Sequence, residues 1–452
     1  MRKEIFGLPL VCLILALACH SCKDGALSPV MSDDIGNPQR IERPHSSFAM
    51  IEEMHGRTAR FAFESAIRAF KELYYDKFQE FVNEDFGFSM EFYTQELLRN
   101  ISLDYNVPGN DTLFYLVNFS NNNGFALVDD HLRVLAVNDN CNFHLSDFNC
   151  DMSEERFNNN PGKWMIAGLI NVSAYCNSFY QRDTTITYMF NEIDSVHFIT
   201  NVFDTIGPLV KMVLSQHAPY NRYCYTPEGF SAVAGCAPIA VTGFFSALTF
   251  PDFINDDGYR WTRIVNDWCQ NHNSPTYGLG LNSEGNALFK RIANIGAGVR
   301  TQYGVFSSYT LNTDVENYLY QFYGDCRFDV PRNPRYDYHR FFANGIPLLV
   351  TGVMTIDDVT DGHMWVFDGD AVHTYEANVY NHGNHITIEG SDTLIHCRLG
   401  WGGDVDGYYR FDIFRPLPDD QIIDERTLID PRFPTTYGIQ ICWIESMLDL
   451  LH

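Results

Sequence analysis

The chain has 452 residues, of which 45% are hydrophobic and 19% are charged. This composition is typical of a globular protein and excludes a disordered polyelectrolyte, and the length predicts two or more domains. The formal net charge of −26 argues against nucleic acid or an anionic membrane surface as a binding partner.

The first residues predict an export signal over 1–18. A basic start is followed by an apolar run that is too short to span a bilayer. Residues 15–19 (LALAC) resemble a bacterial lipobox, which implies cleavage before Cys19 and lipidation of its thiol. Cys22 is a second candidate, and an ordinary secretory signal is the alternative. The prediction is an exported protein, anchored by lipid at a bacterial outer membrane or cell surface, or released after processing.

The next part of the chain predicts a tether and then a small α+β domain. Residues 19–47 are polar and contain Pro, Gly, Asp and Ser, which is typical of a linker. Residues 51–82 carry aromatic and aliphatic side chains at approximately helical spacing. Three short β-type runs then follow, and a helix is expected over about 164–180; the β-type runs are 113–119, 124–128 and 132–137. The predicted domain covers 48–195, with its boundary near 194–204.

The remaining residues, 196–452, predict a second domain that begins helical and ends β-rich. A helix is expected to start at Cys236, because small and apolar residues follow it. The expected strands are 346–353, 364–368, 385–389, 393–399, 408–413 and 437–443. The predicted fold class is therefore α+β, with a helical part and an antiparallel β part.

Cys236 is the candidate nucleophile of this second domain. It follows Gly235 at the expected start of a helix, where the backbone dipole and unpaired N–H groups favour a thiolate. Pro238 suits the first turn, where its missing N–H costs nothing. A buried structural cysteine is the other interpretation of this pattern.

His363 is the candidate general base. It lies 127 positions after Cys236 and follows Gly362, which could let a substrate backbone approach. Such a histidine could protonate the leaving amine of a cleaved peptide bond. A hydrogen-bonded structural histidine at a strand start is the alternative.

Four ordered blocks carry a family resemblance over the second half of the chain. They are 216–221 (QHAPYN), 234–241 (AGCAPIAV), 362–369 (GHMWVFDG) and 400–409 (GWGGDVDGYY). Together they resemble the streptopain-type papain-like cysteine peptidases of family C10. The resemblance implies a papain-like catalytic domain over 196–452. The N-terminal domain predicted over 48–195 is similar to the propeptide of that family, which covers the active-site cleft.

The resemblance also implies roles for individual residues. Cys236 is the nucleophile, and His363 is its partner in a thiolate–imidazolium pair. Gln216 contributes a side-chain amide to the oxyanion hole, together with the Cys236 N–H. Trp401 shields the histidine, and Gly235 and Gly362 line the substrate cleft. The implied protein is a zymogen that acts on protein or peptide substrates and is inhibited by its own prodomain in cis.

Arg398 departs from the family pattern. The family places Asn at this position to orient the histidine, and Leu399 stands where the first Trp of the motif is usual. An Arg cannot accept a hydrogen bond from a histidine N–H, and a cation beside an imidazolium disfavours the charged pair. The alternative function is therefore a catalytically degenerate homologue, a surface lipoprotein that binds peptide or protein. A structure in which Arg398 lies against His363 would favour this alternative.

No metal or organic cofactor is expected. His373, His382 and His385 lie close together in a stretch with a loop-like pattern, so a metal site is one interpretation. Their spacing lacks the i, i+4 pair of a helix that is typical of zinc hydrolases, which argues against such a site. Residues 404–407 (DVDG) lack the rest of a calcium loop and are better explained as a turn. Nine cysteines remain beyond Cys12, Cys19 and Cys22 of the signal region, so at least one is unpaired in an exported chain, and their pairing cannot be read from the sequence.

Overall fold

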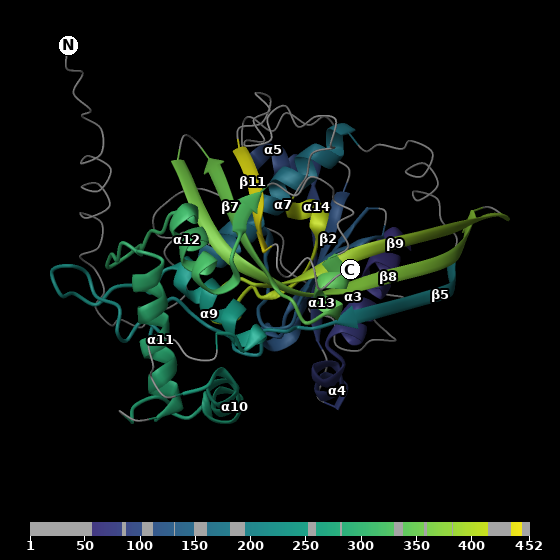
Figure 1. Ribbon diagram of the computed structural model, residues 1–452. Coiled ribbons are helices and arrows are strands. Elements are labelled where there is room, and N and C mark those ends of the chain that lie inside the picture. The colour runs from purple at the N-terminus through teal and green to yellow at the C-terminus, as the bar shows by residue number, and fades with distance from the viewer. Residues whose placement is uncertain are drawn as a thin grey trace, which may run out of the picture.

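The protein is described from a computed structural model (Figure 1). The structure describes residues 57–83, 87–101, 112–130, 132–148, 161–180, 195–251, 259–280, 283–329, 338–356, 359–381, 383–414 and 435–444. The expected signal, tether, Cys19 and Cys22 lie outside these residues. Among the described residues, no helix has the length and apolarity needed to cross a membrane.

Helices and strands follow the chain in the α+β order that the sequence predicts. The helices are α3 (Arg57–Leu73), α4 (Tyr75–Asn83), α5 (Gln95–Ile101), α7 (Pro161–Tyr180), α9 (Cys236–Leu248), α10 (Trp261–Asn271), α11 (Glu284–Gly298), α12 (Asn312–Tyr323), α13 (Tyr338–Ala343) and α14 (Phe411–Phe414). The strands are β1 (Phe88–Thr94), β2 (Thr112–Phe119), β3 (Phe125–Asp129), β4 (Val134–Asn138), β5 (Ser195–Ile206), β6 (Cys326–Asp329), β7 (Leu348–Ile356), β8 (Val359–Asn381), β9 (Asn384–Arg398), β10 (Gly407–Arg410) and β11 (Thr435–Ile444).

One antiparallel sheet of 11 strands runs through the protein in the order β1-β2-β3-β4-β10-β9-β8-β7-β11-β6, with β5 paired to β8. The N-terminal strands join the C-terminal ones where β4 pairs with β10, with Tyr408 opposite Val137. The expected α+β fold with an antiparallel β part is confirmed. The domain limits remain predictions, although the sheet crosses from one expected domain into the other.

Helix α9 forms the centre of the helical part. Ten of its residues are buried, as expected for a helix that is apolar on all sides and packed within a core. It contacts β8, because a Cβ on Gly243 would lie 3.7 Å from Val366. Figure 1 shows α9, α10, α11 and α12 grouped at one end of the sheet. The helix that begins at Cys236 is therefore packed against the strand that carries His363.

Helix α3 packs on the N-terminal strands through small residues. Its buried face includes Ala59, Ala62, Ala66 and Ala69. Such small side chains let a helix approach a sheet closely, and the Phe63 ring packs between them and the strands, with its centroid 4.1 Å from that of Phe88. The expected helix over 51–82 is confirmed within the described residues as α3 and α4.

The hydrophobic core is continuous across the two expected domains. Buried side chains of α7, including Ile166 and Ile170, share one cluster with Trp365, Phe367 and Tyr409 of the β part. Burial of these large apolar side chains contributes most of the free energy of folding. The N-terminal and C-terminal parts therefore stabilise each other.

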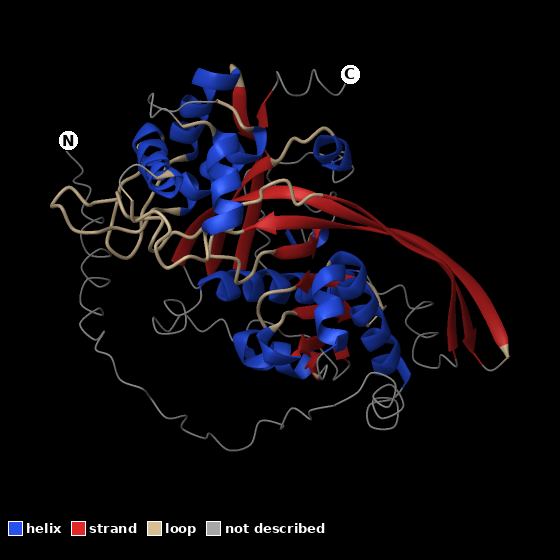
Figure 2. Ribbon diagram, turned by 90° about the horizontal axis from the view of Figure 1, so that it is seen from below, coloured by secondary structure: helices blue, strands red, loops and turns tan. Residues whose placement is uncertain are grey.

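Strands β5, β8 and β9 extend beyond the helices as a long three-stranded arm (Figures 1 and 2). β5 pairs with the outer part of β8 over its whole length, and β9 pairs with β8 from Asn381 back to Val366. The sequence did not predict β5, which covers the expected domain boundary. The expectation of a loop at His373 is wrong, because His373 lies in β8; His385 lies in β9, in agreement with the expected strand 385–389, and His382 lies outside the described residues.

Candidate active site

Cys236 is the first residue of α9. Gly235 precedes it with a φ of 87°, a left-handed conformation that favours glycine. A Cβ on Gly235 would also approach Ser308 to 3.2 Å, so the turn before the cysteine has little room for another residue. The residue itself is half-buried and is a thiol rather than half of a disulfide. Its position directs the N–H groups of the first turn toward the sulfur's surroundings, which favours negative charge there.

The segment before Cys236 is held by backbone hydrogen bonds. The Val233 N–H donates to the Gly304 carbonyl at 3.1 Å, and the Ser308 hydroxyl donates to the Val233 carbonyl at 2.8 Å. The Ala234 N–H donates to the Gln216 carbonyl at 2.8 Å. The structure thus places Gln216 beside the chain that leads into the cysteine.

A second bridge connects the Gln216 segment to the Trp401 segment. Ser215 forms an isolated antiparallel bridge with Trp401. The Gly402 N–H donates to the Leu214 carbonyl at 2.9 Å. The backbone of Gln216, a half-buried residue, therefore runs between the segment of Trp401 and the segment that leads into Cys236.

His363 lies on β8, and its ring contacts the Trp401 segment described above. Its Nε2 is 2.8 Å from the Leu399 carbonyl oxygen, and its ring stacks on Trp401 with centroids 4.0 Å apart. A carbonyl oxygen can only accept, so Nε2 carries the proton and donates it. The other ring nitrogen, Nδ1, then has a lone pair available for a thiol proton.

Burial lowers the pKa of His363 to about 4, and the hydrogen bond to the Leu399 carbonyl raises it only in part. The imidazole is therefore neutral near neutral pH unless a neighbouring anion stabilises its charged form. Gly362 beside it is exposed, and a Cβ there would meet nothing closer than the Gly352 carbonyl oxygen at 3.8 Å. The surface next to the histidine is open on this side.

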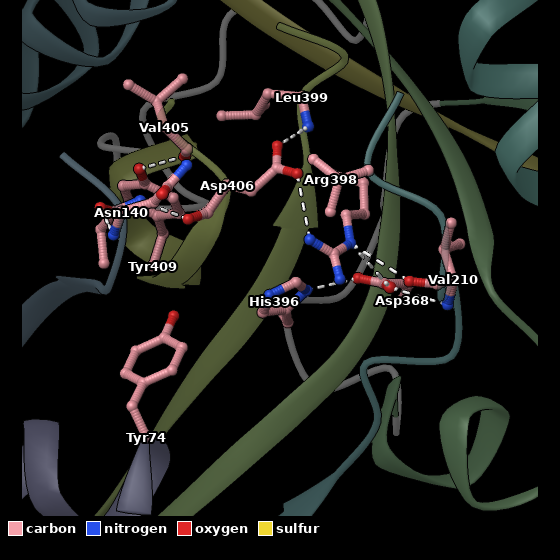
Figure 3. A network of polar contacts seen from close by, with 12 residues as sticks. Tyr74, Asn140, Val210, Asp368, His396, Arg398, Leu399, Val405, Asp406 and Tyr409 are labelled. Atoms are coloured by element: carbon pink, nitrogen blue, oxygen red, sulfur yellow. Dashed lines mark hydrogen bonds and ion pairs between the residues drawn. The ribbon is translucent and has the colours of Figure 1, made fainter. Parts of the chain in front are cut away.

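Arg398 does not orient His363. Its Nε donates to the Val210 carbonyl at 3.3 Å, and its Nη1 donates to Asp406 Oδ2 at 3.2 Å (Figure 3). Its Nε also lies 3.8 Å from Asp368 Oδ2. Burial alone would lower the pKa of Arg398, but Asp406 and Asp368 raise it, and the guanidinium stays charged within this network.

The orienting acceptor is a backbone group, the carbonyl of Leu399. The N–H of the same residue donates to Asp406 Oδ1 at 2.7 Å, and the Leu399 side chain is fully buried. Burial raises the pKa of Asp406, whereas Arg398 and the Leu399 N–H lower it. Asp406 thereby connects the Arg398 guanidinium to the peptide that holds His363.

A second histidine, His396, lies close to this network but is buried within it. Its Nδ1 is 2.6 Å from Asp368 Oδ1, and both side chains are at most 4% exposed. The remaining Asp368 oxygen accepts the Val210 N–H at 3.0 Å. The sequence did not single out Leu399, Asp406, Asp368 or His396 for these contacts. Asp368 and Asp406 stood in motif blocks, and that was the available signal.

Trp401 is also in contact with the N-terminal part of the protein. A Cβ on Gly162, in the first turn of α7, would lie 2.8 Å from the Trp401 ring and 2.6 Å from Val405. Trp401 is therefore packed between His363 and α7. The turn expected at 404–407 lies at 402–405 instead, because Gly407 already belongs to β10, and the Asp406 N–H donates to the Gly403 carbonyl at 3.1 Å.

The histidines of the arm do not form a metal centre with one another. His373 stacks on Phe203 at 4.2 Å, and His385 on Tyr380 at 5.4 Å. Over the described part of the chain, no group of three or more His, Cys, Asp or Glu side chains is arranged to hold a metal ion.

The structure thus has a half-buried thiol at the start of α9 and a histidine with a fixed tautomer on β8, and the segment after Leu399 meets the first turn of α9, where a Cβ on Gly400 would lie 3.1 Å from Ile239. A cysteine and a histidine are the residue types that thiol hydrolases use. Residues 214–409 match the family model described as the Peptidase C10 family. The matched region contains Gln216, Cys236, His363 and Trp401, so the resemblance carried by the four motif blocks is confirmed there.

Two solved structures from Prevotella intermedia are similar to this chain. The first is active wild-type interpain A cysteine protease, which is 20% identical with a TM-score of 0.34. The match covers 53% of this chain and 94% of the interpain A chain. The second, a prointerpain A fragment with a Cys-to-Ala substitution, is 17% identical, with a TM-score of 0.41, and covers 75% of this chain and 96% of its own. The search of curated proteins returned no match.

Proposed function

We propose that the protein is an exported cysteine endopeptidase made as a zymogen. The observation that carries the proposal is the Nε2–H of His363 donating to the Leu399 carbonyl, beside a helix that begins at Cys236. This arrangement leaves a histidine lone pair for the thiol and needs no side-chain orienter. The family match over residues 214–409 supports the same chemistry.

In the proposed reaction, His363 Nδ1 accepts the proton of the Cys236 thiol as the sulfur attacks the peptide carbonyl. Because burial lowers the pKa of His363 to about 4, its imidazole starts the reaction neutral in this scheme, and not as the imidazolium of the ion pair expected from the resemblance. The proton moves as the C–S bond forms, and the Leu399 carbonyl holds the resulting imidazolium through Nε2–H.

The remaining steps use groups from the same set of residues. The Cys236 N–H and the Gln216 amide stabilise the tetrahedral oxyanion, and one such donor contributes about 3 kcal/mol to transition-state stabilisation. His363 then protonates the leaving amine and afterwards activates the water that hydrolyses the acyl-enzyme. No metal or organic cofactor takes part in this scheme.

We further propose that the N-terminal part, residues 48–195, restrains the site until it is cleaved. The pairing of β4 with β10 and the contact of Gly162 with Trp401 support this role. A tethered inhibitor acts at a high effective concentration, so modest contacts are sufficient. Cleavage between α7 and β5 is expected to precede full activity.

The alternative, a homologue that only binds peptide, predicts Arg398 against His363. The contacts of Arg398 with Val210, Asp406 and Asp368 favour the peptidase instead, because they direct the cation elsewhere. Export with lipidation at Cys19, or at Cys22, belongs to the same proposal. Incorporation of a labelled fatty acid into the wild-type chain, and its loss in Cys19→Ser but not Cys22→Ser, tests it.

The main test is covalent labelling of the full chain, before and after limited proteolysis, with a peptidyl epoxide. We expect labelling of Cys236 and peptide turnover after proteolysis, and neither in Cys236→Ala. Cys269→Ala, which removes an exposed thiol, is the matched control and should behave as wild type. A cleaved, folded chain that neither labels nor hydrolyses peptides supports the binding alternative.

A further inference from the structure

Two buried cysteines lie on neighbouring strands at the end of the sheet, away from the four motif blocks. Strands β6 and β11 pair antiparallel, with Cys442 opposite Phe328 and Cys326 opposite Ile444. Because side chains alternate across a strand, Cys326 and Cys442 point to the same face on diagonal positions. They are 7% and 4% exposed.

The two thiols are in contact. The Cys442 thiol donates a hydrogen bond to Cys326, and this bond lowers the pKa of Cys326 and raises that of Cys442. The Cys326 thiol also lies 3.2 Å from the Glu316 carbonyl oxygen, to which it donates. The contact fixes both sulfur atoms within one small polar cluster between α12 and the sheet.

We propose that Cys326 and Cys442 are a redox-active pair that closes to a disulfide in an oxidising compartment. Diagonal positions lie about 7–8 Å apart, at the limit of disulfide reach, so bond formation requires a shift of the strand backbone as well as rotation of the two side chains. β6 has four residues and forms the edge of the sheet, where such an adjustment distorts only one strand neighbour.

The chemistry is a thiol–disulfide exchange with a small disulfide such as oxidised glutathione. The Cys326 thiolate attacks one glutathione sulfur, and the first glutathione leaves as a thiolate that takes the Cys326 proton. The Cys442 thiolate then attacks the Cys326 sulfur of the mixed disulfide, and the second glutathione leaves and takes the Cys442 proton. Two protein thiols are oxidised, and one oxidant disulfide is reduced to two thiols.

The disulfide would enclose the strands that carry His363. Cys326 and Cys442 are 116 positions apart, and the chain between them contains β7, β8, β9 and β10. Closing a long loop restricts the unfolded chain strongly, so the bond stabilises the β part. It would also fix β11 between β7 and β6 without consuming Cys236.

The test uses the full-length Cys236→Ala chain, equilibrated with oxidised glutathione, alkylated and mapped by mass spectrometry. We expect a peptide linked through Cys326 and Cys442, and a fall in Tm of about 5 °C or more on reduction. Export sets where the bond forms in the cell, but this measurement does not depend on export or on peptidase activity.

Matched variants separate this bond from a general effect of reductant. Cys326→Ser and Cys442→Ser should each lose the linked peptide and the Tm shift. Cys397→Ser, which removes another buried thiol, should keep both. Alkylation of both Cys326 and Cys442 after oxidation, or linkage of either one to a different cysteine, overturns the proposal.

Discussion

Two histidines of the same sheet, His363 and His396, have opposite environments. The His363 ring is half-buried, donates to a neutral carbonyl and stacks on Trp401. The His396 ring is fully buried and bonds to the Asp368 carboxylate, which Arg398 also approaches (Figure 3). Each ring commits one nitrogen to a hydrogen bond, but only the half-buried His363 ring is accessible, whereas the His396 ring is enclosed by the core.

The same comparison explains why Arg398 is compatible with the site. Its charge is balanced by Asp406 and Asp368 on the His396 side, so it does not act on His363. The Leu399 peptide lies between the two regions, with its carbonyl toward His363 and its N–H toward Asp406. The buried network therefore positions the site through one peptide group.

Removal of His363 should have the largest effect on activity. His363→Ala in the proteolytically activated chain should lower kcat by about 10³-fold or more, because both proton transfers lose their carrier. Thermal stability should change little. Peptide turnover and calorimetry on the same preparation measure the two effects, and activity close to wild type contradicts the assignment.

His396→Ala should give the opposite pattern. Loss of the buried hydrogen bond from His396 leaves the Asp368 carboxylate with one partner fewer and should cost about 1–3 kcal/mol of unfolding free energy. The kcat of the folded fraction should fall much less than in His363→Ala. Urea unfolding combined with active-site titration separates the two, and a stable but inactive variant would remove the distinction between the histidines.

Asp406 variants should link the two regions. Asp406→Asn keeps an acceptor for the Leu399 N–H but loses the ion pair with Arg398, so stability should fall by about 2 kcal/mol. Asp406→Ala should also lower kcat, by about 10-fold, because the Leu399 N–H loses the carboxylate oxygen that fixes the direction of its peptide group. The kcat ratio of the two variants is the measurement, and equal kcat values contradict a positioning role.

Acid should destabilise the protein through His363. Its folded pKa of about 4 is below the usual value, so the unfolded state binds more protons between about pH 4 and 6.5. The stability that the neutral ring contributes is complete above this window and is lost as pH falls through it. His363→Gln should flatten this slope in urea unfolding, and His373, whose pKa burial also lowers to about 4, accounts for part of what remains.

Gly362→Ala should have the smallest effect on the fold and a selective one on substrate. The added Cβ meets only the Gly352 carbonyl oxygen at 3.8 Å, so stability should change by less than about 0.5 kcal/mol. If substrate passes over this exposed glycine, KM should rise with little change in kcat. Unchanged KM for every peptide tested would place the substrate elsewhere.

The sequence predicted the parts of the site that depend on residue type. Cys236, His363, Gln216 and Trp401 stand in ordered blocks, and the structure brings their segments together. The Leu399 carbonyl could not be predicted, because every residue supplies a carbonyl and its direction depends on the fold. The charge network was missed for a related reason: ion pairs such as Arg398–Asp406 depend on side-chain directions that spacing does not encode.

The fold shows the same limit at β5. The helices and most strands follow local apolar patterns, which the sequence contains. β5 instead depends on pairing with the distant strand β8, and its exposed apolar residues Ile199 and Val202 gave no clear burial pattern. Strands that depend on long-range pairing are the least visible in sequence.

The central claim is that His363 is a neutral histidine protonated at Nε2, held by the Leu399 carbonyl. Nitrogen-15 NMR of histidine-labelled, full-length Cys236→Ala, assigned with His363→Gln and His396→Gln, tests it directly. We predict an Nε2–H signal for His363 that titrates near the pKa of about 4. An Nδ1–H tautomer, or titration near the ordinary value of about 6.5, would contradict the account.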